Sequence, residues 1–259
     1  MGWGAFQMLR VQAVTKSFGG VPVVDGVSFE IAKGEIVGLI GPNGAGKTTM
    51  FNLIAGSLRS DGGQIVLNGV RIDRLPQHAR VGLGLSRTFQ TPKPFPGMTV
   101  IENIMLAARG QAGEGILPNL LQPRRVAAEE LRTLERAGEL AKFVGLTHLA
   151  HEPARVLSGG QRKLLELARV LMTEPRLVML DEPAAGVNPT LLQTIVDKIL
   201  QMNRQGVTVC IIEHNMGLVA LLCQRVLVMA AGQVISHGKP ADVLRDPAVI
   251  EAYLGGVAA

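Results

Sequence analysis

The chain has 259 residues, of which 47% are hydrophobic, and a formal net charge of +5 at pH 7. No stretch approaches the roughly 18 consecutive apolar residues of a membrane-spanning helix, and the first residues lack the charged and apolar regions of a signal peptide. Aromatic residues make up only 3% of the chain and no run of Lys and Arg exceeds two, so the stacking platforms of single-strand binders are scarce and we expect no nucleic-acid partner.

The first third of the chain is predicted to be mostly β structure. Five segments are expected to form strands: 9–16, 21–31, 35–40, 64–72 and 85–89. The third of them is an apolar run without polar alternation, which is typical of a buried strand. A glycine-rich loop follows it, and a helix is predicted from Lys47 to about Ala55. This third also holds nine Lys and Arg against five Asp and Glu, so most of the net positive charge lies here.

The composition changes after residue 91, where three prolines and a glycine indicate a linker. Helices are predicted over 100–108 and 124–144, with a loop rich in Gly and Pro between them. We interpret residues 91–160 as a helical subdomain inserted into one α/β domain, whose catalytic core is formed by residues 1–90 and 161–259.

Strands and helices alternate again in the last hundred residues. The segments predicted in turn are a helix, a strand, a helix and a strand over 160–173, 177–180, 190–204 and 207–213. Short strands and helices follow over 226–236 and 240–254. Alternation of this kind implies a mostly parallel sheet covered by helices. The expected fold is therefore α/β, with an antiparallel β region at the N-terminus.

A phosphate-binding motif follows the third predicted strand. The residues that fit G-x-x-x-x-G-K-[ST] are Gly41, Pro42, Asn43, Gly44, Ala45, Gly46, Lys47 and Thr48. Glycines let backbone N–H groups approach phosphates closely, and the following helix points its partially positive N-terminus at them. We expect Lys47 to reach the β- and γ-phosphates of a nucleotide, and the hydroxyl of Thr48, next to Thr49, to bind Mg²⁺.

Two adjacent carboxylates end the apolar segment Leu177–Leu180. Asp181 and Glu182 would repel each other at a strand end unless a cation or distinct roles separate them. We expect Asp181 to hold Mg²⁺ and Glu182 to act as the general base toward an attacking water molecule.

Between these two motifs lies the pentapeptide Leu157-Ser158-Gly159-Gly160-Gln161, in which Ser158 suits a helix N-cap. The three motifs in this order resemble the ATP-binding subunits of ABC transporters, over nearly the whole chain. The resemblance implies a P-loop NTPase fold, a single ABC ATP-binding domain over residues 1–259, and ATP with Mg²⁺ as ligands. It also implies two subunits packed head to tail, with residues 158–161 of one facing the γ-phosphate on the other.

Three single residues acquire expected roles through the resemblance, and a fourth departs from the family pattern. Gln90 matches the glutamine that touches Mg²⁺ and water and relays to the membrane domain, and His214 matches the switch histidine that contacts the γ-phosphate. Phe18 matches the aromatic residue that stacks on adenine. Asn188 stands where many ABC proteins carry Asp, which leaves open how the two ATP sites communicate.

Several shorter stretches resemble the ATP-binding subunits of branched-chain amino acid importers: 87–90, 98–103, 184–189, 212–216 and 252–255. The resemblance implies an ATP hydrolase that powers import of a branched-chain or related amino acid. The alternatives are an ABC ATPase of another system, such as lipopolysaccharide export, and an ABC ATPase acting on ribosomes or DNA. A GTPase or kinase is disfavoured because no Asn-Lys-x-Asp motif occurs.

The expected partners are membrane permease subunits, a second ATP-binding subunit and, indirectly, a solute-binding protein. The sequence leaves open whether the second subunit is identical to this chain or different from it. We expect the chain to be cytoplasmic and peripheral on the inner face of the cell membrane. Cys210 and Cys223 are not in CxxC spacing and are expected to be buried, reduced thiols, as is usual in the cytosol.

Overall fold

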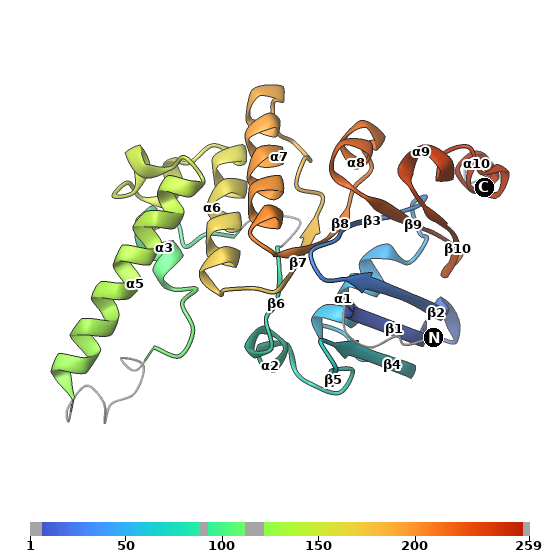
Figure 1. The fold of residues 1–259 in the computed structure, drawn as a ribbon, viewed down its shortest axis with the longest axis horizontal. Helices are drawn as coiled ribbons and strands as arrows, with labels where there is room; N and C mark the ends of the chain where they lie inside the picture. The colour runs from blue at the N-terminus through green and yellow to red at the C-terminus, as the bar shows by residue number, and fades with distance from the viewer. Residues whose placement is uncertain (1–6, 89–92, 112–121, 256–259) are drawn as a thin grey trace. The chain divides into compact units, whose positions relative to one another are not determined.

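The computed structural model describes residues 7–88, 93–111 and 122–255. Contacts between residues divide the chain into two compact units (Figure 1). The core unit comprises residues 1–87, 176–184 and 199–259, and the helical unit comprises 88–175 and 185–198. The helical unit thus extends beyond the predicted insertion, since it also includes residues 161–175 and 185–198. The limits of the insertion at residues 91 and 160 stay a prediction.

A six-stranded sheet forms the centre of the core unit, in the order β10-β9-β3-β8-β7-β6. Its strands are β3 (Ile36–Ile40), β6 (Leu85–Arg87), β7 (Leu177–Asp181), β8 (Thr208–Ile212), β9 (Arg225–Ala230) and β10 (Gln233–Gly238). All neighbours pair in parallel except β10, which runs antiparallel to β9. Asp181 is opposite Ile212 in the pairing of β7 with β8, so the residues that follow these two strands emerge at the same edge of the sheet.

The second sheet of the core unit is antiparallel and four-stranded, in the order β2-β1-β4-β5. Its strands are β1 (Gln7–Phe18), β2 (Val21–Ala32), β4 (Gly62–Leu67) and β5 (Val70–Arg71). The prediction of one strand over 64–72 was wrong in this detail. Asn68 and Gly69 have positive φ angles of 46° and 84°, as a type I′ hairpin turn requires, and they fold the segment back on itself.

Five helices belong to the core unit: α1 (Lys47–Ala55), α2 (Gln77–Gly82), α8 (Met216–Leu222), α9 (Pro240–Val243) and α10 (Pro247–Gly255). In Figure 1, α8 and α9 lie on one side of the six-stranded sheet and the four-stranded sheet lies on the other. The hydrophobic core joins residues of both sheets with buried residues of α1, among them Met50, Phe51 and Ile54. The sequence did not predict α2 and α8.

Arg80 on α2 is a buried cation, with only 1% of its surface exposed. Its guanidinium donates hydrogen bonds to the carbonyl oxygens of Leu53 and Ile54 at 2.6 and 2.7 Å, and to those of Leu75 and Asp73 at 2.9 and 3.2 Å. The last carbonyls of a helix have no partner within the helix. Arg80 donates hydrogen bonds to two of these carbonyl oxygens and so fixes the C-terminal end of α1.

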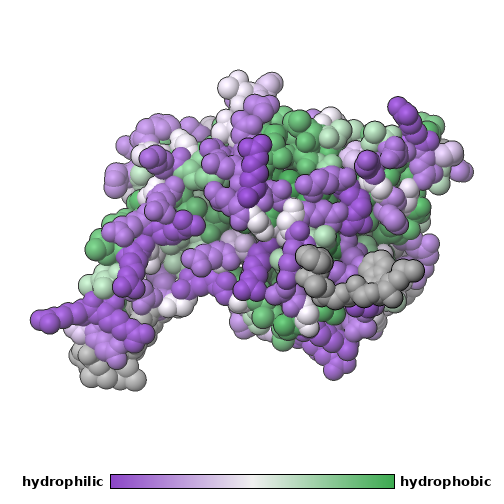
Figure 2. Space-filling model, in the orientation of Figure 1, coloured by the Kyte–Doolittle hydropathy of each residue, from purple (hydrophilic) through white to green (hydrophobic). Residues whose placement is uncertain are grey.

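The helical unit contains α3 (Val100–Met105), α5 (Pro123–Phe143) and α6 (Gly159–Met172), each of which packs against the other two. Helix α7 (Pro189–Arg204) begins in this unit and ends in the core unit. The surface over α5 is largely hydrophilic (Figure 2), as its many Arg and Glu residues imply. Among the residues described, no helix combines the length and apolar character needed to cross a membrane.

Both cysteines are free thiols and buried, as the sequence predicted. Cys210 lies in β8 and Cys223 follows α8. Burial raises the pKa of Cys223 to about 12 and that of Cys210 further still, so neither is a reactive thiolate at neutral pH.

Candidate functional site

The loop between β3 and α1 is closely surrounded by backbone. A Cβ atom on Gly41, whose φ is 146°, would lie 2.0 Å from the carbonyl oxygen of Met229. A Cβ atom on Gly46, whose φ is 94°, would lie 2.5 Å from the carbonyl oxygen of Val23. Both positions therefore require glycine for the fold. Gly44 differs, because a Cβ atom there would meet nothing within 4 Å, and its neighbour Asn43 is exposed as well.

Lys47, the first residue of α1, turns its side chain back over this loop. Its Nζ donates hydrogen bonds of 2.8 Å to the carbonyl oxygens of Gly41 and Pro42, and only 6% of the residue is exposed. Burial lowers the pKa of Lys47, while the carboxylate of Glu182 acts to raise it. The next residue, Thr48, is exposed and Thr49 is half-buried, so a hydroxyl at the start of α1 is open to a ligand.

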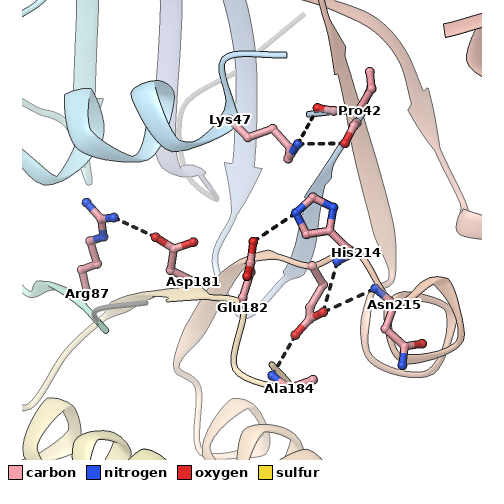
Figure 3. A network of polar contacts seen from close by, with 10 residues as sticks. Pro42, Lys47, Arg87, Asp181, Glu182, Ala184, His214 and Asn215 are labelled. Atoms are coloured by element: carbon pink, nitrogen blue, oxygen red, sulfur yellow. Dashed lines mark hydrogen bonds and ion pairs between the residues drawn. The ribbon is translucent and has the colours of Figure 1, made fainter. Parts of the chain in front are cut away.

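Asp181, the last residue of β7, is a buried carboxylate with an arginine beside it. Nη2 of Arg87 lies 2.8 Å from Oδ2 of Asp181 (Figure 3). The same guanidinium donates to the side chain of Asn52 and lies 5.9 Å from the ring centre of Phe51, and both of these residues belong to α1. Arg87 thus connects the end of β6, the helix after the phosphate-binding loop and the end of β7.

Glu182 and His214 are in direct contact, with 3.0 Å between Oε1 of the carboxylate and Nε2 of the imidazole. They follow the neighbouring strands β7 and β8, and Figure 3 shows the contact beside Lys47. Glu182 has a φ of 48°, a left-handed conformation that is uncommon for a residue with a side chain. Its N–H donates a 3.0 Å hydrogen bond to the carbonyl oxygen of Ile212. The sequence-predicted base and switch histidine are therefore brought together.

Phe18 ends β1 and has 47% of its surface exposed. An exposed aromatic ring at this point could offer a face to a planar ligand, and its predicted stacking on adenine stays a prediction. Nζ of Lys16 lies 5.5 Å from the ring centre and 2.7 Å from Oδ1 of Asp61. The lysine is thus held beside the ring by an ion pair.

Residues 158–161 open α6 in the helical unit, where Ser158 is the N-cap, as predicted. Its Oγ accepts a 3.3 Å hydrogen bond from the N–H of Gln161, whose Oε1 accepts a 2.9 Å bond from the N–H of Ser158, which makes a capping box. The two glycines differ. A Cβ atom on Gly160 would lie 1.9 Å from Cδ2 of Leu191, whereas one on Gly159 would meet nothing within 4 Å.

Two further predicted residues need separate comment. Gln90 lies outside the described residues. Asn188 has a local role, because its Oδ1 accepts a 2.9 Å hydrogen bond from the N–H of Leu191 in the first turn of α7. Asparagine and aspartate both serve well at such a cap, so the helix start is preserved without the charge.

Sequence reasoning missed one buried residue beside this site. Glu213, between β8 and His214, accepts hydrogen bonds from the backbone of Ala184, His214 and Asn215 (Figure 3). The only feature of the sequence that could have indicated a role for Glu213 was its position next to the predicted histidine. The contacts of Arg87 were also unforeseen, although its sequence neighbourhood had been singled out.

A family model described as ABC transporter matches residues 24–185, and another described as branched-chain amino acid ATP-binding cassette transporter matches residues 233–259. This chain belongs to the ABC transporter ATP-binding family. The cassette is 40% identical over 249 residues to a probable branched-chain amino acid transport ATP-binding protein LivG of Archaeoglobus fulgidus, covering 96% of each chain. It is 38% identical to the corresponding LivG of Escherichia coli K12, covering 96% of this chain and 98% of that one.

Solved structures show the same fold. A nucleotide-free ATP-binding cassette from an ABC transporter is 37% identical, with a TM-score of 0.82, and the match covers 95% of this chain and 98% of that chain. Another cassette in its ADP conformation is 36% identical with the same TM-score, covering 97% of this chain and all of that chain. The predicted P-loop NTPase fold and ATP-hydrolase class are thereby confirmed, and this ABC cassette binds nucleotide.

Proposed function

We propose that this ABC cassette hydrolyses ATP to power an importer of branched-chain or related amino acids. The observation that carries the proposal is the match of residues 233–259 to the branched-chain cassette model, in a chain that also brings Glu182 and His214 into contact. The relatives named above point to the same solutes, and they favour import of these solutes over lipopolysaccharide export.

In this proposal Lys47 and the backbone N–H groups of residues 41–46, except Pro42, hold the nucleotide phosphates. Lys47 exchanges the carbonyl oxygens of Gly41 and Pro42 for phosphate oxygens when ATP binds. A buried ammonium gains more from a formal negative charge than from neutral carbonyls. The exposed ring of Phe18 stacks on the adenine.

The residues present fit a Mg²⁺ ion that arrives with ATP. Mg²⁺ keeps several waters and takes few protein ligands beside substrate phosphates. The hydroxyl of Thr48 and the carboxylate of Asp181 would hold it, together with Gln90. When bound, Mg²⁺ neutralises phosphate charge during the transfer.

Glu182 takes a proton from the water that attacks the γ-phosphorus, and the bond between that phosphorus and the bridging oxygen of ADP breaks. The contact with His214 orients the carboxylate of Glu182 before the nucleotide arrives. His214 then contacts the γ-phosphate through the same imidazole. The reaction therefore draws on residues that follow two adjacent strands.

A second ATP-binding subunit completes each site in this proposal. The start of α6, with Ser158 as its cap, provides N–H groups that attract an anion. Gly159 is open toward solvent and is not required by packing within its own chain, which supports an approach from outside. Two subunits would close head to tail around two ATP molecules, with residues 158–161 of each at the other's γ-phosphate.

The remaining partners are membrane permease subunits, which place the cassette on the inner face of the membrane, and indirectly a solute-binding protein. A permease helix would dock near Gln90 and residues 92–100. The test is reconstitution in liposomes of the cassette with its permease subunits, purified from the native host. Addition of binding protein loaded with leucine, isoleucine or valine is expected to raise ATP hydrolysis severalfold. Stimulation by lipopolysaccharide instead, or co-sedimentation with ribosomes, would overturn the proposal.

A further inference from the structure

Glu213 is a buried carboxylate held by backbone amides from two separate segments. Only 3% of its surface is exposed. Its Oε1 accepts a 2.9 Å hydrogen bond from the N–H of Ala184, and its Oε2 accepts bonds of 3.1 and 3.4 Å from the N–H groups of His214 and Asn215. The dashed lines that reach Ala184, His214 and Asn215 in Figure 3 mark these three hydrogen bonds. One segment follows Glu182, and the other carries His214.

The contacts of Glu213 use both oxygens of its carboxyl group as acceptors. Burying a carboxylate is unfavourable unless hydrogen bonds replace its hydration, and bonds from N–H groups to a charged oxygen are the stronger kind. Donors approach both oxygens of Glu213. Glutamine has one oxygen acceptor and one NH₂ donor, so in either orientation its NH₂ would face a backbone N–H. The site therefore distinguishes Glu from its closest isostere.

The segment that Glu213 holds contains a strained residue. Glu182 has the left-handed φ of 48°, which persists only where the surrounding structure fixes it, and such strain concentrates at functional sites. The backbone N–H of Glu182 donates a hydrogen bond to the carbonyl oxygen of Ile212. Two residues later, the backbone N–H of Ala184 donates a hydrogen bond to the carboxylate of Glu213. The strained residue thus lies between two attachments to the end of β8.

We propose that Glu213 is a positioning residue that keeps Glu182 and His214 in contact by joining their two segments. The inference rests on the proposed function insofar as this pair carries out hydrolysis. Lys47 and the phosphate-binding loop are held by other contacts. Loss of Glu213 should accordingly reduce kcat while leaving nucleotide affinity nearly unchanged.

The experiment compares Glu213→Gln and Glu213→Asp with the control Glu35→Gln in the full-length protein. Glu35 also accepts from a backbone N–H, that of Ala32, and from Arg225, but it precedes β3, at the opposite end of the strand from the phosphate-binding loop. We expect Glu213→Gln to lower kcat at least tenfold, with the affinity for a fluorescent ATP analogue within about twofold of wild type. Aspartate keeps both acceptor oxygens, so Glu213→Asp should retain more activity than Glu213→Gln, and the control should retain nearly all.

Amide hydrogen exchange at Ala184 gives a readout that does not require turnover. It should be faster in Glu213→Gln than in wild type, and unchanged in Glu35→Gln. Wild-type kcat or unchanged exchange in Glu213→Gln would overturn the inference, as would equal loss of kcat and nucleotide affinity in both Glu213 variants. If Glu213→Gln does not fold, Glu213→Asp is used instead. Its carboxylate is one methylene shorter, so a smaller fall in kcat and faster exchange at Ala184 are expected, and wild-type values of both would overturn the inference. A wild-type chain without ATPase activity would contradict the proposed function, and the exchange experiment would still test the role of Glu213.

Discussion

Arg87 and Asp181 form an ion pair of 2.8 Å in which the side chains are only 13% and 3% exposed. Asp181 is the carboxylate that we propose as a Mg²⁺ ligand, so a protein cation already lies beside it without a metal. Removing one partner of a buried pair leaves an uncompensated charge and typically destabilises a protein by about 3–5 kcal/mol. Arg87 is thus expected to stabilise the cassette between rounds of nucleotide binding.

We predict that Arg87→Met lowers the free energy of unfolding of the nucleotide-free protein by about 3 kcal/mol. The deficit should shrink when MgATP is added, because the metal restores a cation beside Asp181. Urea unfolding with and without MgATP measures both effects. Arg10→Met is the control, since its pair with Glu30 is 3.6 Å long and more than a third exposed on both sides, and it should cost less than about 1 kcal/mol. A nucleotide-free stability equal to wild type would contradict the prediction.

Lys47→Ala is expected to weaken ATP binding by about 10- to 100-fold, the effect of losing hydrogen bonds to a charged group. Titration with a fluorescent ATP analogue measures the affinity. Lys33→Ala removes an exposed lysine ahead of β3 and should leave the affinity unchanged. Unaltered affinity and turnover in Lys47→Ala would remove this lysine from the nucleotide site.

Glu182→Gln should bind ATP with near wild-type affinity and hydrolyse it about 10²- to 10⁴-fold more slowly, because glutamine keeps the shape but accepts no proton. Phosphate release measures the rate. Trapped ATP should also favour the closed dimer, seen as earlier elution in gel filtration with ATP than with ADP. Hydrolysis within threefold of wild type would mean that another group is the base.

The two glycines at the start of α6 allow a matched comparison. Gly159→Ala should fold normally, since nothing in its own chain obstructs a Cβ atom, but should lower hydrolysis at least tenfold by blocking the second subunit. Gly160→Ala should instead lower the unfolding free energy by about 1–3 kcal/mol, the cost of overpacking against Leu191. Thermal unfolding and ATPase assays on both variants separate the effects. Full activity in Gly159→Ala would argue against contact with a second subunit there.

Glu102 forms a capping box at the start of α3, where its carboxylate accepts from the N–H and Oγ of Thr99 at 2.7 and 2.8 Å. These bonds lower the pKa of Glu102. Its contribution to stability is therefore present above the unfolded pKa of about 4.3 and lost as the pH falls through the lower folded value. We predict that Glu102→Gln, which can still cap, flattens this acid dependence and leaves permease co-purification intact.

Glu102→Lys should in contrast weaken permease assembly more than ATP binding, if this surface docks the permease. Co-purification of cassette and permease measures the first effect, and nucleotide titration measures the second. Equal permease recovery for the Lys and Gln variants would remove Glu102 from the docking surface.

Local patterns carried most of the fold prediction. The apolar run 35–40 indicated a buried strand, and the alternation of strands and helices after residue 160 indicated the parallel sheet. The turn at Asn68-Gly69 was present in the sequence as a hairpin signal and was overlooked. The box formed by Thr99 and Glu102 also fits a known spacing. These two features were predictable.

The remaining features depend on contacts between distant segments. The link from Glu213 to Ala184 spans 29 residues and that from Arg87 to Asp181 spans 94. Neither contact can be predicted from the spacing of residues in the sequence, because each depends on which strands lie side by side in the folded sheet. The roles of the individual site residues stay predictions, and the variants above test them.

The close packing around Gly41 and Gly46 affects which residues of a related sequence can indicate that it is an active ATPase. Met229 and Val23 exclude side chains at these two positions whether or not a nucleotide ever binds. A descendant that had lost ATPase activity would still need both glycines in order to fold. Gly44 and Gly159, which meet no neighbouring atoms, are under no such packing constraint. Gly44 nevertheless has a left-handed φ of 79°, which by itself favours glycine. Retention of Gly159, together with Lys47 and Glu182, is therefore the better sign that a related sequence is still an active enzyme.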